Sequence, residues 1–351
     1  MSSWDVVVVG GGIAGVSVAH ELAADRSVLL LEAETELARH TTGRSAASYI
    51  PGHGLPPVRE LTTASRPLFD ALAEEAGYPF LTPRPVLYTA HDADDEALLR
   101  RELLPLDAVD DLTVDEACRR WPALRPDRLL AAGWVAGACD VDAMGLHQHW
   151  RRGLVARGGE IRTGARVTSL EPGPDAWRVG SGHEHVDAGA VVLAAGAWTD
   201  QLLALAGADP IGLRPLRRTI AVVRVPPGAP VRRDDPFVVS AGDHWYAKPE
   251  GEFLLVSPSE ETPAEPGDPR PDELDVAIAL ERVNAVTTLG LRSVATSWTG
   301  LRTFAPDRLP VRREALPGLW VFAGQGAATA SSRPRPRPAR WRPPCEWNVV
   351  L

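Results

Sequence analysis

The sequence predicts an α/β protein with a parallel, helix-covered sheet and a second β region that is mainly antiparallel. Two observations lead to this fold class. Residues 4–32 read as strand, helix and strand, which is the βαβ unit of a parallel sheet. Short apolar runs such as Thr219–Val225 and Glu252–Ser257 are typical of antiparallel strands. The 351 residues, 44% of them hydrophobic, are enough to build both parts.

The N-terminal unit carries the strongest motif of the chain. The strand Val6–Val9 is continuously β-branched, as expected when both faces are buried, and it runs into Gly10, Gly12 and Gly15 in the spacing G-x-G-x-x-G. Gly10 permits a tight turn, Gly12 lets backbone N–H groups approach a pyrophosphate, and Gly15 lets the following helix pack closely on the strand. The helix N-terminus adds partial positive charge. This turn therefore predicts a dinucleotide site in a Rossmann-like domain.

The acid that follows limits the choice of dinucleotide. A second buried strand, Val28–Leu31, ends at Glu32, twenty residues after Gly12. A carboxylate there can accept hydrogen bonds from a ribose diol, whereas the extra phosphate of NADP needs an Arg. The run therefore favours NAD or FAD and does not separate them.

Composition excludes several other classes. Net charge is −9, and residues 333–351 hold five Arg and one acid, so the rest of the chain is more acidic still. An acidic body argues against nucleic-acid binding. Cys118, Cys139 and Cys345 form no metal-ligand spacing, which predicts no metal site and favours a reducing cytoplasm. No apolar run of 18 residues and no basic leader occurs, so we expect a cytoplasmic chain without a membrane segment.

The segment Ala38–Tyr49, which reads ARHTTGRSAASY, resembles a loop of the FAD-dependent D-amino-acid oxidase/dehydrogenase superfamily. The segments GARVTSLE, AGAVVLAAGAWTDQL, WTGLRTFAPDRLPV and GLWVFAGQG resemble further motifs of that superfamily, in its order, so the resemblance covers residues 1–326. PPVRELTTASRPLFDAL, TPRP, PLRRT and WYAKP are most similar to D-arginine dehydrogenases.

The resemblance implies FAD as the cofactor, bound without a covalent link although His40 precedes the TTG loop. Most of the residues expected to contact FAD are small, because the backbone must approach the cofactor closely. The expected contacts are Gly10, Gly12, Ile13, Ala14, Gly15, Glu32, Ala33, Thr42, Gly43, Arg44, Ser45, Ala46, Ala47, Val167, Ala195, Gly196, Trp198, Gly324, Gln325 and Gly326.

The same resemblance implies two interleaved domains. We expect an FAD-binding domain over residues 1–80, 140–214 and 300–330, a substrate-binding domain over 81–139 and 215–299, and an aberrant, disordered tail over 331–351. Local sequence signals also predict helices within these ranges. Residues 58–72 mark an apolar helical face that ends near Gly77, and Thr113 with Glu116 forms a capping box. Asp142–Arg157 reads as an amphipathic helix.

A flavin enzyme that oxidises an amino acid must orient the substrate, and a bidentate Arg is the best partner for a carboxylate. Arg302 matches the family motif for that role. Of Arg217 and Arg218 one should point inward, since neighbouring strand residues face opposite sides, but the sequence does not say which. Tyr246 matches a family tyrosine that could bind the carboxylate, and His53 could line the entrance or take the amine proton.

The expected side-chain pocket contains Ser48, Ile50 and Val86. In D-arginine dehydrogenases an acid that holds the guanidinium group follows the P-R-P motif, and this chain has Val86 there. A buried cationic side chain would be uncompensated without that acid, so we expect a small or apolar D-amino acid.

The predicted activity is oxidation of the CH–NH2 group of a D-amino acid to an imino acid by hydride transfer to flavin N5, with oxygen or a quinone as the electron acceptor. Two alternatives stay open. One is oxidation of N-methyl or cyclic amino acids such as sarcosine or proline, and the other is a C-terminally defective, weakly active or inactive flavin-binding remnant.

The second alternative comes from the tail. Family members continue the final glycine turn into a helix directed at the flavin, whereas this chain reads Ala327–Ser332 and then alternates Arg and Pro. Proline at every second position forbids a helix. A shifted reading frame in a G+C-rich gene explains the change, although a functional polyproline segment is also possible. Resequencing the gene distinguishes the two, because only a frameshift predicts an Ala-rich helix one base out of register.

Overall fold

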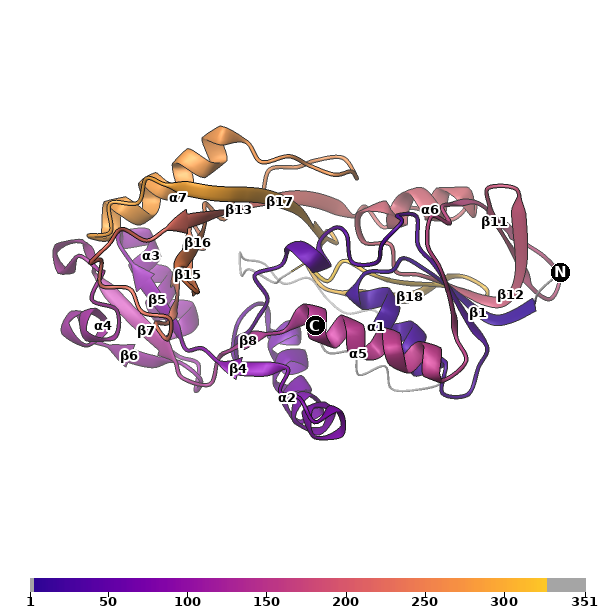
Figure 1. The fold of residues 1–351 in the computed structure, drawn as a ribbon, viewed down its shortest axis with the longest axis horizontal. Helices are drawn as coiled ribbons and strands as arrows, with labels where there is room; N and C mark the ends of the chain where they lie inside the picture. Colours follow the sequence, from indigo (N-terminus) through magenta and orange to yellow (C-terminus); the bar gives the residue numbers. More distant parts are fainter. Residues whose placement is uncertain (1–2, 327–351) are drawn as a thin grey trace.

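The computed structural model describes residues 3–326. The predictions for the Arg- and Pro-rich tail, for residues 327–330 and for Cys345 lie outside these residues. Figure 1 shows two large sheets toward opposite ends of the molecule, joined along one side by the long strands β13 (Arg214–Arg224) and β17 (Val294–Phe304).

The first sheet contains the N-terminal βαβ unit. Its strand order is β10-β11-β12-β1-β2-β9, with β19 beside β12 and β18 beside β19. The strands β9, β2, β1, β12 and β19 run parallel to one another, whereas β10, β11 and β18 join the sheet by antiparallel pairing. The members are β1 (Ser3–Val9), β2 (Val28–Leu31), β9 (Glu160–Arg162), β10 (Val167–Pro172), β11 (Trp177–Ser181), β12 (Glu184–Leu193), β18 (Val311–Leu316) and β19 (Leu319–Ala323).

Helices cover both faces of this sheet, as the continuous apolar strands predict. Val6 and Val8 of β1 pack under α1 (Ile13–Leu22) and α5 (Ala143–Ala156), whereas Val7 and Val9 pack against α6 (Thr199–Leu205). The α/β fold class is thereby confirmed.

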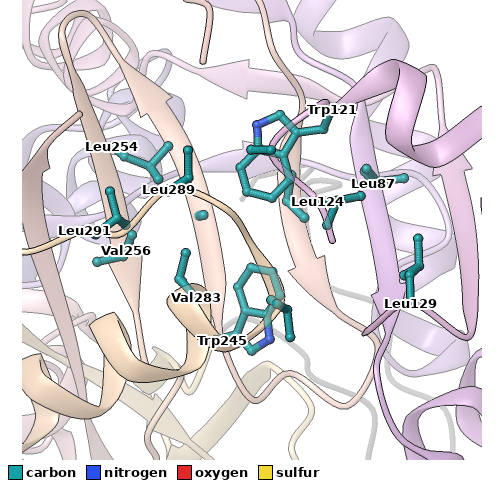
Figure 2. Packing of buried hydrophobic residues seen from close by; sticks show 14 of the residues in the cluster. Leu87, Trp121, Leu124, Leu129, Trp245, Leu254, Val256, Val283, Leu289 and Leu291 are labelled. Atoms are coloured by element: carbon teal, nitrogen blue, oxygen red, sulfur yellow. The ribbon is translucent and has the colours of Figure 1, made fainter. Parts of the chain in front are cut away.

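The second sheet is mainly antiparallel, in the order β17-β13-β16-β15-β14-β5-β7-β6, with one parallel pair, β14 with β5. Its other strands are β5 (Val86–Ala90), β6 (Asp110–Leu112), β7 (Ala131–Val135), β14 (Phe237–Ser240), β15 (Tyr246–Glu250) and β16 (Phe253–Ser257). On its outer face, α7 (Glu273–Val286) and the segment around Trp121 bury an apolar cluster that also includes Trp245 and Leu254 (Figure 2).

A three-stranded sheet connects the two parts, with β8 (Cys139–Val141) between β3 (Ser48–Tyr49) and β4 (Leu81–Pro83). The remaining helices are α2 (Pro56–Ala76), α3 (Ala93–Leu98), α4 (Val114–Arg120) and the single turns η1 (Thr42–Arg44), η2 (Leu99–Leu103), η3 (Pro126–Arg128) and η4 (Gly196–Trp198). Within residues 3–326, no helix combines the length and apolar character needed to cross a bilayer.

Local signals in the sequence are confirmed where side chains cap helices. Thr113 and Glu116 form the capping box of α4, Asp142 caps α5, and α2 ends at Gly77 in the left-handed conformation. The division into domains stays a proposal. Its boundaries at 214/215 and 299/300 fall inside β13 and β17, so the two proposed domains would share these strands.

Candidate active site

A cavity of about 1140 Å3 lies between the two large sheets. On its first-sheet side it is lined by the glycine turn after β1, the end of β2 and the turn after β12. On its second-sheet side it is lined by residues of β13, β14, β15 and β17. The cavity therefore connects the predicted dinucleotide site with the predicted substrate site.

The glycine turn has the backbone that its motif requires. Gly10 has a φ of 113°, which favours glycine, and a Cβ there would lie 2.5 Å from the carbonyl oxygen of Ala194. A Cβ on Gly15 would lie 1.8 Å from the carbonyl oxygen of Gly10, so α1 can approach β1 this closely only with glycine at residue 15. A Cβ on Gly12 would meet only Thr42 Oγ1, at 3.4 Å, and Gly12 borders the cavity.

Glu32 lies where the motif predicts it, at the end of β2 and on the cavity wall. Its carboxylate accepts hydrogen bonds from the backbone N–H groups of Gly11 at 2.6 Å and Glu34 at 2.8 Å. These bonds fix the carboxylate beside the glycine turn. A carboxylate has further acceptor sites, so it can still bind a ribose diol.

The loop after β2 closes the same side. Thr42 Oγ1 accepts the Ile13 N–H at 3.0 Å and so joins η1 to the start of α1. Arg44 borders the cavity, but its guanidinium donates to Asp268 at 2.5 Å and to the Thr299 carbonyl at 2.8 Å. These partners occupy much of the guanidinium of Arg44, which is one of the predicted FAD contacts. His40 lies against Trp198 and hydrogen-bonds Glu34 at 3.1 Å.

Most of the predicted cofactor residues border this cavity. They are Gly10, Gly12, Ile13, Ala14, Glu32, Ala33, Thr42, Arg44, Ser45, Ala46, Ala47, Val167, Ala195, Gly196, Trp198, Gln325 and Gly326. Three predicted glycines do not border it: Gly15, Gly43 and Gly324. Gly15 packs on Gly10, a Cβ on Gly43 would lie 2.5 Å from the Ala38 carbonyl oxygen, and Gly324 has a φ of 73°. Each of these three glycines permits a local backbone geometry or a close backbone contact and does not line the cavity.

On the second-sheet side, strand register decides which arginine enters the cavity. Leu216 of β13 pairs with Arg302 of β17, and Arg218 lies two residues further along β13. Residues two apart share a face, so Arg218 and Arg302 both project into the cavity, which both of them line. Arg217 faces the other side and pairs with Asp275 of α7 at 3.0 Å. The prediction that left Arg217 as a candidate is corrected to Arg218 alone.

The structure also corrects the prediction that Val86 belongs to the side-chain pocket. It does not line the cavity and is 1% exposed, because it is buried in the cluster with Tyr88 and Phe237. Phe237 pairs with Val86 across the sheet and itself lines the cavity. The residue at position 86 therefore cannot contact a ligand directly. The predicted pocket residues Ser48 and Ile50 do line the cavity.

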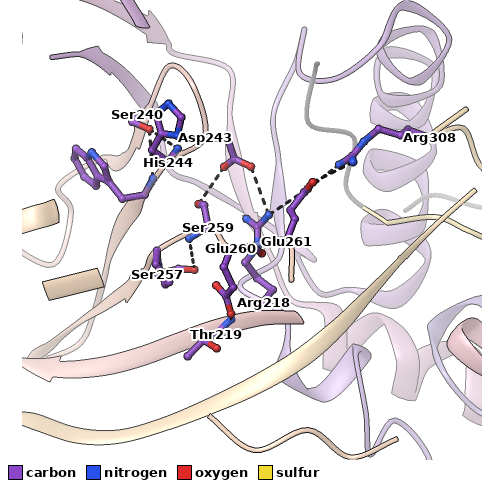
Figure 3. A network of polar contacts seen from close by, with 12 residues as sticks. Arg218, Thr219, Ser240, Asp243, His244, Ser257, Ser259, Glu260, Glu261 and Arg308 are labelled. Carbon is purple, nitrogen blue, oxygen red and sulfur yellow. Dashed lines mark hydrogen bonds and ion pairs between the residues drawn. The ribbon is translucent and has the colours of Figure 1, made fainter. Parts of the chain in front are cut away.

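Charges surround Arg218 (Figure 3). Its Nη2 lies 3.5 Å from Asp243 and 3.6 Å from Glu261, which in turn pairs with Arg308 at 2.6 Å. Arg218 is 8% exposed, and within residues 3–326 its Nη2 is buried without a hydrogen-bond partner. Burial lowers the pKa of Arg302 to about 10, with the neighbouring positive charge of Arg218 as the next cause, so the Arg302 side chain is still charged at neutral pH.

Two tyrosines and a histidine complete this side. Tyr88 and Tyr246 line the cavity, and burial raises the pKa of both. His53 Nδ1 lies 3.1 Å from the Tyr88 hydroxyl. Burial lowers the pKa of His53 below its ordinary value of 6.5, so the imidazole is neutral at pH 7. A neutral imidazole can accept a proton.

Sequence reasoning missed Asp243, Tyr88 and an apolar wall made of Ile220, Phe237 and Val239, all of which line the cavity. The alternation in residues 219–225 could have identified Ile220 through its two-residue offset from Arg218. Asp243 gave no signal, because an acid beside glycine in a turn is ordinary.

Observations of the cavity fit FAD. The face of Gly12 is open toward it, and the side-chain nitrogen of Gln325, on the cavity wall, is buried without a hydrogen-bond partner among residues 3–326. The fold and the cavity together have the features expected of an FAD-dependent oxidoreductase. A family model described as "DAO: FAD dependent oxidoreductase" matches residues 5–332, so the chain belongs to this family and FAD is its cofactor.

Individual relatives are distant. The chain is 26% identical over 349 residues to mitochondrial dimethylglycine dehydrogenase of Rattus norvegicus, covering 92% of this chain but only 41% of that protein. It therefore spans about two fifths of that relative. It is 26% identical over 343 residues to glycine oxidase of Pseudomonas putida, covering 92% of this chain and 89% of that one.

Solved structures show the same fold. Glycine oxidase from Geobacillus kaustophilus has a TM-score of 0.81 at 24% identity and covers 93% of this chain and 90% of that one. L-proline dehydrogenase from P. horikoshii also has a TM-score of 0.81, at 20% identity, with 93% and 89% coverage.

Proposed function

We propose that the chain oxidises the CH–NH2 group of a D-amino acid with a small or apolar side chain to the imino acid. The observation that carries this proposal is the convergence of Arg218 and Arg302 on one cavity that also borders the glycine turn. Both guanidinium groups line the cavity, where a substrate carboxylate could accept charge-assisted hydrogen bonds from them. FAD, when bound, accepts the hydride that leaves the substrate Cα.

The role proposed for the arginines is binding and orientation. Arg218 Nη2 lacks a hydrogen-bond partner in the described part of the chain, and Arg302 stays charged at neutral pH. Together they would hold the carboxylate in a charge-assisted, geometrically specific contact. The Tyr246 hydroxyl, held protonated by a raised pKa, can donate a further hydrogen bond. Fixing the carboxylate fixes the direction of the Cα–H bond.

The side-chain preference rests on the apolar wall. Ile50, Ile220, Phe237 and Val239 line the cavity on the same side as Arg218 and Arg302. Such a surface favours an apolar side chain, and this support replaces Val86, which does not contact the cavity. The D configuration follows from the motif resemblance to D-arginine dehydrogenases.

A turnover panel with an artificial electron acceptor tests this substrate class. We expect D-leucine and D-alanine to have higher kcat/KM than D-arginine, and their L enantiomers to be inactive. Higher kcat/KM for D-arginine would contradict the side-chain preference, and turnover of the L forms would contradict the configuration.

N-methyl or cyclic amino acids are the second candidate. Two of the similar proteins are named for dimethylglycine and L-proline, and both classes carry a carboxylate that the same arginines could hold. Sarcosine, dimethylglycine and both prolines therefore belong in the panel. Turnover of one of them at more than ten times the kcat/KM of D-leucine would favour this candidate.

His53 is proposed to accept the proton that the substrate ammonium must lose before hydride leaves. Its lowered pKa keeps it neutral above about pH 6.5, so its contribution should decline only as pH falls through that lowered pKa. We expect His53→Asn to lower kcat/KM for D-leucine by about a hundredfold at pH 7. The deficit should narrow at high pH, where the free substrate amine is already neutral.

The pH profile of kcat/KM for both proteins is the measurement. A deficit that stays constant from acidic to alkaline pH would assign His53 a structural role through its contact with Tyr88 and would contradict proton transfer.

A further inference from the structure

We propose that Asp243 binds the ammonium group of the substrate, so that the cavity recognises the amino acid as a zwitterion and not only as a carboxylate. This inference deepens the proposed function and rests on it. Three acidic residues line the cavity within the described chain: Glu32, Glu34 and Asp243. The two glutamates belong to the glycine-turn side, which leaves Asp243 as the acid beside the arginines.

The position of Asp243 is fixed by the turn between β14 and β15. Its φ is 54°, in the left-handed region that Asp tolerates better than most residues. Its N–H donates to the Ser240 carbonyl at 2.9 Å, and Ser240 Oγ accepts the next N–H, that of His244, at 2.6 Å. These bonds hold the carboxylate at the cavity wall before any ligand arrives.

The carboxylate also has acceptor capacity to spare. Oδ1 accepts a hydrogen bond from Ser259 at 3.2 Å, and Oδ2 faces Arg218 Nη2 at 3.5 Å, an ionic contact longer than an ordinary hydrogen bond (Figure 3). An ionised carboxylate has about four lone-pair sites, so a further donor can bind.

The geometry matches an α-amino acid. Its carboxylate and ammonium are carried by the same carbon, so a carboxylate held by Arg218 Nη2 places the ammonium within reach of the neighbouring Asp243. Without a negative charge there, Arg218 and Arg302 would repel the ammonium. Asp243 already acts electrostatically on residues of this cavity. Its charge raises the pKa of both Arg302 and His53, whereas burial lowers them.

A structural alternative is that Asp243 only neutralises Arg218. Glu261 provides the matched control, because it lies 3.6 Å from the same Arg218 Nη2 but does not line the cavity. A neutralising role predicts equal effects of Asp243→Asn and Glu261→Gln, whereas ammonium binding predicts an effect specific to Asp243.

Calorimetric titration of the oxidised holoenzyme separates the two roles. The probes are 2-aminoisobutyrate, which has no Cα hydrogen and cannot be oxidised, and pivalate, which replaces its ammonium with a methyl group. We expect Asp243→Asn to weaken 2-aminoisobutyrate at least tenfold and to leave pivalate binding unchanged or tighter. Glu261→Gln should change both affinities by similar factors. Asp243→Glu, which keeps the charge, should still prefer 2-aminoisobutyrate and covers the case in which the Asn variant does not fold.

The inference about Asp243 would be overturned if Asp243→Asn weakened the binding of both probes equally. It would also be overturned if the wild type or Asp243→Glu showed no preference for 2-aminoisobutyrate. In either case the proposed function would still stand as long as D-amino acids reduce the flavin. A wild type that binds neither probe and is not reduced by any D-amino acid would overturn the proposed function as well.

Discussion

Arg302→Met is expected to lower kcat/KM for D-leucine by at least about a hundredfold, because removing one partner of a buried charge pair costs about 3–5 kcal/mol. Arg302 lines the cavity and stays charged at neutral pH. Arg302→Lys should lose less, since it keeps the charge but not the bidentate geometry. Steady-state kinetics on flavin-loaded protein gives the values.

Arg217→Met is the matched control on the paired strand. Arg217 contacts Asp275 outside the cavity, so its loss removes no contact with a ligand there and should change kcat/KM by less than about threefold. Equal losses in the Arg302 and Arg217 variants would contradict the assignment of Arg302, as would an Arg302→Met enzyme with normal kinetics.

Gly12→Ala is expected to weaken FAD binding by about 10- to 100-fold without unfolding the protein. Its φ of −73° suits alanine, and the added methyl group would meet only Thr42 before entering the cavity. There it would displace the pyrophosphate from the backbone N–H groups, and hydrogen bonds to charged groups contribute about 1.5–3 kcal/mol. Titration of the apoprotein with FAD, followed by flavin fluorescence, measures the change.

Gly15→Ala is the contrasting variant. Its methyl group would collide with the Gly10 carbonyl, so both the thermal stability of the apoprotein and FAD binding should fall. If Gly12→Ala binds FAD as tightly as the wild type, the pyrophosphate does not lie at this turn.

The fold was most predictable where one residue type allows only one local geometry. The buried strand Val28–Leu31, the glycine turn after β1 and the capping box of Thr113 and Glu116 agree with prediction because each depends on neighbours in sequence. The proposed domain boundaries were harder to locate. Strands β13 and β17 are each 11 residues long and give no break in pattern where the boundaries were drawn.

The substrate side of the site depended on long-range pairing that no local pattern contains. The choice between Arg217 and Arg218 follows from the pairing of Leu216 with Arg302, and Val86 is buried beside Phe237, which lies on a strand about 150 residues away. The role proposed for Asp243 depends on a turn that brings a single carboxylate beside Arg218. Such contacts appear only when the sheet is assembled.

The visible absorbance spectrum of the purified protein, before and after anaerobic addition of D-leucine, tests the central claim most directly. We predict a yellow protein whose flavin absorbance is bleached by D-leucine and not by L-leucine. A yellow protein that no amino acid bleaches would contradict the proposed chemistry. A colourless protein that does not take up added FAD would favour the C-terminally defective remnant.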